Sequence, residues 1–198
     1  MNFIYENDNS LCEKLCNDII ELYECDEKKY DGLTFGGVQK KIKNTSDLII
    51  PQNEKWKNIE ECLYKELHKN ISKYIEQINC ESYNPEFNNG RDAHIFKNDN
   101  LDVYSFIVQK YEKNKGEYVY HNDFGFENGK YRVITCLWYL NDVEEGGETQ
   151  FWDSYKIKPK TGKLILFPAN WNFQHRGLMP TSSNKYIVTT WLYLNKEQ

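Results

Sequence analysis

Residues 131–140 read "YRVITCLWYL", and this run of mostly apolar residues is the clearest indication of the fold. It is rich in the β-branched and aromatic residues that strands favour. Alternate residues of a strand face the same side, so Thr135, Leu137 and Tyr139 would share one face. The run therefore predicts a strand with two different faces.

Similar runs follow one another through the C-terminal half, separated by turn residues. They read "LDVYSFIVQKY", "EYVYHNDF", "GGETQFW", "KLILFP" and "KYIVTTWLYL". Strands at this spacing are typical of a sandwich or a barrel. We therefore predict an α+β protein whose mainly β core occupies residues 99–198.

The N-terminal half predicts two helices. In the first, "SLCEKLCNDIIELYEC" from residue 10 to 25, Ser10 and Glu13 match a capping box. The second spans about residues 53–79, and its apolar stripe predicts packing against a sheet; the stripe consists of Trp56, Ile59, Leu63, Leu67, Ile71 and Ile78. We expect one domain over residues 1–198, in which residues 1–95 form a helical support region.

Between the predicted helices, residues 30–52 mix a possible strand with Gly-rich turns and are a candidate substrate loop.

Composition argues against two classes of partner. The net charge is −5, whereas phosphate contacts need clustered Lys and Arg, so we expect no nucleic-acid partner. No apolar run approaches the ~20 residues of a membrane span, and the first residues lack the pattern of a signal peptide. The six cysteines form no CxxC pair, so we expect reduced thiols and a cytoplasmic location.

Three residues form a candidate metal site. His121 and Asp123 lie two positions apart in "YVYHNDFGF" (residues 118–126), a spacing that places both on one side of a strand. This pair alone is weak, because it occurs often by chance. His175, in "WNFQHRG", offers a third ligand. Two histidines and one carboxylate form the facial triad of non-haem Fe(II) sites, which leaves coordination positions open.

Lys185 indicates a second ligand beside the metal. Lys185, Ile187 and Thr189 are alternate residues, so they would face the same side of a strand. If that side faces inward, the ammonium group of Lys185 is buried. A buried ammonium needs an anionic partner, and no carboxylate is obvious on a matching face. A small dicarboxylate would meet that need, and Tyr139 could donate its hydroxyl to it.

Residues 107–194 resemble the 2-oxoglutarate/Fe(II)-dependent oxygenases, in the prolyl 4-hydroxylase-like branch. The resemblance rests on "VQKYEKNKGEYVYHNDFG", "RVITCLWYLNDVEEGGETQF", "IKPKTGKLILFPANWNFQHRG" and "NKYIVTTW", which occur in the family's order. The chain lacks the RxNxTxR pattern of the nucleic-acid-repair branch. The oxygen-sensing hydroxylases have Arg in place of Lys185, so collagen-type and microbial or viral relatives fit better.

The resemblance implies a double-stranded β-helix, a jelly-roll barrel with the N-terminal helices packed outside it. It also implies that His121, Asp123 and His175 bind iron. Residues that bind the co-substrate would be Lys185, at its distal carboxylate, with Tyr139, Tyr111, Thr149 and Thr189; Tyr111 would lie near the metal end.

The implied reaction hydroxylates a prolyl residue or another amino-acid side chain. It consumes O2 and 2-oxoglutarate and releases succinate and CO2, and ascorbate keeps the iron reduced. The expected substrate is a peptide, a protein or an amino-acid-like molecule. The alternative is a non-enzymatic, cupin-like metal-binding or peptide-binding module.

The substrate itself is not named by the sequence. Residues 30–57, 124–130 and 171–174 are the candidate specificity surfaces, and His94 and Arg176 are candidate substrate contacts.

Overall fold

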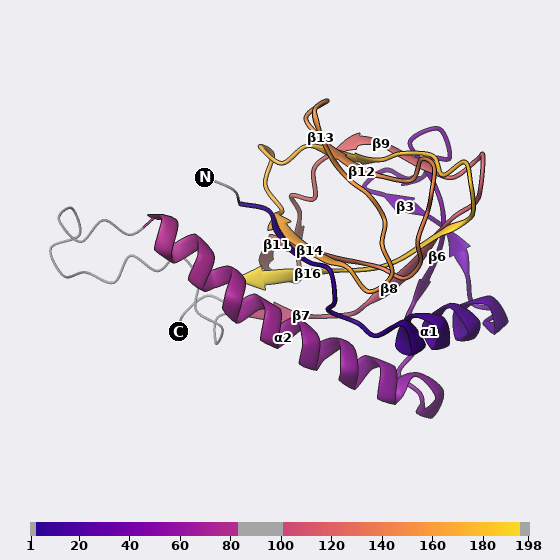
Figure 1. Cartoon of the computed structure of the whole chain (residues 1–198), viewed down its shortest axis with the longest axis horizontal. Coiled ribbons are helices and arrows are strands. Elements are labelled where there is room, and N and C mark those ends of the chain that lie inside the picture. Colours follow the sequence, from indigo (N-terminus) through magenta and orange to yellow (C-terminus); the bar gives the residue numbers. More distant parts are fainter. Residues whose placement is uncertain (1–2, 83–100, 195–198) are drawn as a thin grey trace, which may run out of the picture.

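The computed structural model describes residues 3–82 and 101–194. Two antiparallel sheets form the β core, and two helices lie along one side of it (Figure 1). The helices are α1 (Glu13–Cys25) and α2 (Glu54–Ser82). The architecture is therefore the predicted one, a mainly β core with helices outside.

The larger sheet has the order β1-β14-β11-β16-β8-β6-β2, with β10 beside β11 and β7 beside β16. Its strands are β1 (Tyr5–Asn7), β2 (Tyr30–Asp31), β6 (Ser46–Ile49), β7 (Leu101–Val103), β8 (Ile107–Tyr111), β10 (Phe126–Glu127), β11 (Lys130–Tyr139), β14 (Leu164–Pro168) and β16 (Lys185–Leu194).

The smaller sheet has the order β13-β12-β15-β9-β5. Its strands are β5 (Lys43–Asn44), β9 (Glu117–His121), β12 (Thr149–Phe151), β13 (Tyr155–Ile157) and β15 (His175–Gly177). A separate hairpin pairs β3 (Leu33–Thr34) with β4 (Gly37–Val38).

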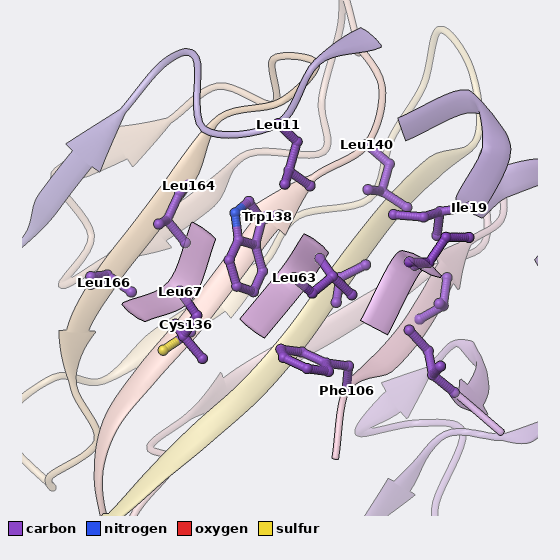
Figure 2. Packing of buried hydrophobic residues seen from close by; sticks show 14 of the residues in the cluster. Leu11, Ile19, Leu63, Leu67, Phe106, Cys136, Trp138, Leu140, Leu164 and Leu166 are labelled. Carbon is purple, nitrogen blue, oxygen red and sulfur yellow. The ribbon is translucent and has the colours of Figure 1, made fainter. Parts of the chain in front are cut away.

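The helices pack on the outer face of the larger sheet. Leu63 and Leu67 of α2 lie against Cys136 and Trp138 of β11 (Figure 2). The whole predicted stripe of α2 is buried in this cluster, which confirms its packing role. Neither α1 nor α2 combines the length and the apolar character of a membrane-spanning helix.

Alternation along the central strands separates this outer core from the barrel interior. Trp138 of β11 and Val188 of β16 belong to the core beneath the helices. Their neighbours Tyr139 and Ile187 belong to a second apolar cluster, together with Tyr111 of β8. The shared faces predicted for β11 and β16 are therefore observed, and the predicted co-substrate residues face the interior.

The capping box predicted for α1 is wrong. Helix α1 begins at Glu13, and its N-cap residue, Cys12, makes no side-chain capping bond. The hydroxyl of Ser10 instead accepts hydrogen bonds from Trp138 Nε1 at 3.0 Å and from Asn70 Nδ2 at 3.3 Å. A buried indole N–H needs an acceptor, and Ser10 meets that need.

The N-terminal region contributes strands as well as helices. It supplies β1, β2 and β6 to the larger sheet and β5 to the smaller one. Strands β5 and β6 are separated by Thr45 alone, so the chain crosses from one sheet to the other at this point. The segment predicted as a possible strand with turns thus helps to enclose the interior.

Candidate active site

The structure brings the three predicted metal ligands together. His121 ends β9, Asp123 follows two residues later, and His175 begins β15. One potential ligand atom from each residue lies within 4.8 Å of the other two. The Nε2 atoms of both histidines lie 3.6 Å from carboxylate oxygens of Asp123.

Backbone carbonyls orient both imidazoles. His121 Nδ1 lies 2.9 Å from the oxygen of Val119, and His175 Nδ1 lies 3.0 Å from the oxygen of Phe173. A carbonyl only accepts, so each Nδ1 carries the proton and each Nε2 presents a lone pair. Burial and the nearby His175 lower the pKa of His121 to about 3, which keeps its ring neutral. This donor set fits a divalent metal ion.

A loop, and not a strand, positions Asp123. Strand β9 ends at His121, so the predicted strand over both residues is too long. The amide of Phe124 donates to the side chain of Asn122, and Thr135 Oγ1 donates to Asp123 Oδ2 at 2.8 Å. Burial raises the pKa of Asp123, but the two imidazoles and the Thr135 hydroxyl outweigh burial and lower it. The carboxylate therefore stays ionised, as a metal ligand must.

An irregularity in β9 places Tyr118 beside the metal ligands. His175 pairs with His121 and Gly177 pairs with Tyr118. The paired residues are three positions apart on β9 but only two positions apart on β15, so β9 contains one extra residue. Such a bulge turns residues three apart to the same face. The rings of Tyr118 and His121 accordingly stack, with centroids 3.5 Å apart and an interplanar angle of 13°. The sequence alone does not predict Tyr118 as a site residue, because regular alternation along a strand would place it on the opposite face from His121.

Lys185 is buried with little to balance its charge. Its side chain donates to the carbonyl oxygen of Gly147 at 2.9 Å, and Nζ lies 3.8 Å from the ring centroid of Tyr111. Within residues 3–82 and 101–194, no carboxylate lies within ion-pairing distance of it. Burial lowers the pKa of Lys185 to about 7, although the charge of Glu148 opposes the shift. A carboxylate ligand fits this position.

The other predicted co-substrate residues lie on the same interior surface. Tyr139 donates its hydroxyl to Thr149 Oγ1 at 2.6 Å, and Thr189 Oγ1 donates to the carbonyl of Cys136. The ring of Tyr111 lies over Lys185 and is also close to Gly177, where an added Cβ would come within 3.0 Å of it. Tyr111 thus lies between Lys185 and the strand that begins with His175.

The candidate substrate contact Arg176 does not face this surface. Arg176 alternates with His175 along β15 and points to the other face, where it donates to Gln150 Oε1 and lies over the ring of Tyr120. The placement of Arg176 therefore does not support it as a substrate contact. His94 lies outside the described residues.

Trp191 stands next to Asp123, and Arg132 packs on its indole ring. The buried indole N–H of Trp191 interacts with the Asp123 carboxylate and helps to lower the pKa of that carboxyl. The guanidinium of Arg132 lies 3.8 Å from the indole ring centroid. The Trp191 interaction helps to keep the Asp123 carboxylate ionised between the two imidazoles.

The sequence matches a known family model. Residues 106–193 match the family described as the 2OG-Fe(II) oxygenase superfamily. A provisionally named prolyl 4-hydroxylase of Acanthamoeba polyphaga mimivirus is 26% identical over 211 residues, which cover 96% of this chain and 78% of that protein. Prolyl 4-hydroxylase 5 of Arabidopsis thaliana is 27% identical over 120 residues, and the match covers 46% of this chain but only 40% of the plant protein.

Solved structures share the whole fold. A viral collagen prolyl hydroxylase from Paramecium Bursaria Chlorella virus-1, in complex with 2OG, has a TM-score of 0.66 at 21% identity and covers 98% of this chain and 97% of its own. A Trichoplax adhaerens prolyl hydroxylase, bound to a hypoxia inducible factor oxygen degradation domain peptide fragment, has a TM-score of 0.72 at 19% identity, with coverages of 98% and 84%. The fold is thus the double-stranded β-helix of these enzymes.

Proposed function

Because residues 106–193 belong to the 2OG-Fe(II) oxygenase superfamily, we propose that this chain is an Fe(II)- and 2-oxoglutarate-dependent dioxygenase. Its substrate would be a prolyl residue, or another amino-acid side chain, within a peptide. The observation that carries the proposal is the facial triad of His121, Asp123 and His175 together with a buried Lys185, which has no carboxylate partner among residues 3–82 and 101–194.

The site residues have separate roles in this proposal. His121, Asp123 and His175 bind iron, and Lys185 binds the distal carboxylate of 2-oxoglutarate by a charge-assisted hydrogen bond. Iron, 2-oxoglutarate and O2 bound together supply the oxidising power that converts a substrate C–H to C–OH, with release of succinate and CO2. Tyr139, Thr149 and Thr189 line the co-substrate, and Tyr111 lies near its metal end. We include ascorbate as the reductant that keeps iron active.

Aromatic side chains near the triad support a peptide substrate. Phe124 follows Asp123 directly, Trp152 follows the strand residue paired with His175, and Trp171 lies four residues before His175. All three are exposed, at 55%, 47% and 68%. Exposed aromatic rings provide flat apolar surfaces on which a pyrrolidine ring packs.

A cytoplasmic location remains part of the proposal. Cys12, Cys16, Cys25, Cys62 and Cys136 are all free thiols, which is the usual state in a reducing compartment.

An anaerobic binding experiment tests the proposal. Apoprotein given Fe(II) and 2-oxoglutarate should develop the weak visible absorption, near ~500 nm, of a metal–keto acid chelate. His175→Ala should abolish this band. Arg176→Ala is the matched control, because its side chain points to the opposite face of the same strand, and the band should persist.

A peptide screen then tests the reaction. Pro-containing peptides incubated with iron, 2-oxoglutarate and O2 should gain about 16 Da, one oxygen atom, with one succinate formed per hydroxylation. A chelate band without succinate on any peptide would favour a metal-binding module over an enzyme.

A further inference from the structure

We propose that a buried ion pair between Lys43 and Asp47 positions the metal ligand His121, acting through the ring of Tyr118. The inference deepens the proposed function and rests on it, because it concerns the same metal site. Lys43 and Asp47 are positioning residues here and touch neither substrate nor metal.

The ion pair connects the two sheets across the interior. Lys43 belongs to β5 of the smaller sheet, and Asp47 belongs to β6 of the larger one. Lys43 Nζ lies 2.6 Å from Asp47 Oδ2, and the two side chains are only 6% and 2% exposed. Because they lie only four positions apart, the pair also fixes the place where the chain crosses between sheets.

The carboxylate of Asp47 faces the interior. Its neighbour Leu48 belongs to the core beneath the helices, so alternation turns Asp47 the other way. Gln109 Nε2, from the adjacent strand, donates to Oδ2 at 3.4 Å. Burial first, and the charge of Asp47 second, raise the pKa of Tyr111 well above its usual value, which places Asp47 near the proposed co-substrate site.

The ammonium group of Lys43 lies against Tyr118. Residues Lys43 and Tyr118 are directly paired between β5 and β9, so their side chains share a face. Lys43 Nζ lies 5.5 Å from the ring centroid of Tyr118, within the range of a cation–π contact. The Tyr118 ring is therefore in contact with both the cation and the imidazole of His121 on which it stacks.

Stacking restrains a motion of His121 that its hydrogen bond leaves free. The bond from Nδ1 to the Val119 carbonyl sets the direction of Nε2 within the ring plane. A stacked neighbour limits the tilt of that plane. Groups behind a metal ligand that orient it in this way typically change metal affinity by about 10- to 100-fold when lost.

A contribution to folding stability does not by itself explain the Lys43–Asp47 ion pair. A buried ion pair is often no more stabilising than an apolar pair of similar volume. Lys43→Met combined with Asp47→Leu keeps volume and removes both charges, so it isolates the positioning effect from the cost of leaving one charge unpaired.

Cobalt binding to the apoprotein provides a readout independent of activity. Full-length protein without 2-oxoglutarate or substrate is titrated with Co(II), followed by its visible absorption. The Kd of the Lys43→Met/Asp47→Leu variant should rise about tenfold, and that of Tyr118→Leu by a similar factor. Tyr118→Phe, which keeps the ring, and Lys43→Arg, which keeps the charge, should bind like the unaltered chain.

Combining the changes tests whether they act along one route. The triple variant Lys43→Met/Asp47→Leu/Tyr118→Leu should bind Co(II) no more weakly than Tyr118→Leu alone, because coupled residues are not additive. Leu67→Ala, in the core beneath α2, destabilises the fold far from the triad and should leave the Kd unchanged. It controls for a general loss of stability.

Several results would overturn the inference. An unchanged Kd for Co(II) in the pair variant would show that the pair does not act through Tyr118. The same conclusion would follow if the Kd increase of the triple variant equalled the product of the increases of the pair variant and of Tyr118→Leu. Should the pair variant not fold, equal Kd values for Tyr118→Leu and Tyr118→Phe would refute it instead. If the unaltered chain binds no Co(II) in a His175-dependent way, the proposed metal site itself fails.

Discussion

At the scale of single residues, Lys185 shows how burial prepares a site for an anion. Its ammonium group has a carbonyl and a ring for neighbours, and burial lowers its pKa to about 7 from an ordinary 10.5. Between these pH values the unfolded chain binds more protons than the folded one. The ligand-free protein should therefore gain stability as pH rises through this window.

Binding of 2-oxoglutarate should take up a proton at pH 8. A carboxylate beside Lys185 favours its charged form, so the lysine, mostly neutral in the free protein at that pH, becomes protonated in the complex. Calorimetric titration at pH 8, with Fe(II) present and O2 excluded, in two buffers of different ionisation enthalpy, would measure this uptake, up to about one proton per site.

Lys185→Arg provides the control for this titration. The guanidinium keeps its charge throughout this range, so the variant should bind with no proton uptake from this residue. Equal heats in the two buffers for the unaltered chain would contradict a direct contact between Lys185 and the co-substrate.

At the scale of elements, the turn before β12 depends on two glycines. Gly146 and Gly147 have positive φ angles of 70° and 76°. A Cβ at Gly146 would lie 2.3 Å from the carbonyl oxygen of Met179, a backbone atom with little room to move. The turn also presents the Gly147 carbonyl to Lys185, so its shape matters to the site as well as to the fold.

Gly146→Ala should lower the free energy of unfolding by about 2 kcal/mol or more. Left-handed backbone costs a residue with a side chain roughly 1–2 kcal/mol, and the collision with Met179 adds to it. Gly129→Ala is the matched control, since its φ is also positive but an added Cβ would meet nothing within 4 Å. Urea unfolding of both variants should show the smaller loss at Gly129; equal losses would exclude the steric contribution.

At the scale of the whole molecule, a polar network joins the helix layer to the sheet. Asn70 of α2 is fully buried. Its Oδ1 accepts from Tyr5 and Asn7, and its Nδ2 donates to Ser10, whose hydroxyl also accepts from Trp138. One amide thus connects α2 with the N-terminal strand and with the centre of the larger sheet.

Asn70→Ala should lower the free energy of unfolding by about 2–3 kcal/mol, because it leaves buried hydrogen-bonding groups without a partner. Asn58→Ala makes the same change at an exposed position of the same helix and should stay within about 0.5 kcal/mol. Urea unfolding would compare the two. A loss at Asn70 no larger than that at Asn58 would show that the network adds nothing to stability.

Local pattern was enough to predict much of this protein. Alternation identified the strands and the interior faces of β11 and β16, and helical spacing identified the buried stripe of α2. The identities and spacing of His121, Asp123, His175 and Lys185 predicted the site. These signals succeed because strand and helix periods are properties of neighbouring residues, which a single sequence contains.

Tertiary structure alone decided the rest. The bulge in β9 exists only through its pairing with β15, so parity along one strand could not bring Tyr118 onto His121. Ser10 resembles a helix cap in sequence, but a buried indole 128 positions away competes for its hydroxyl. Lys43 and Asp47 are four residues apart, yet only the division of β5 and β6 between two sheets makes them a buried pair across the interior.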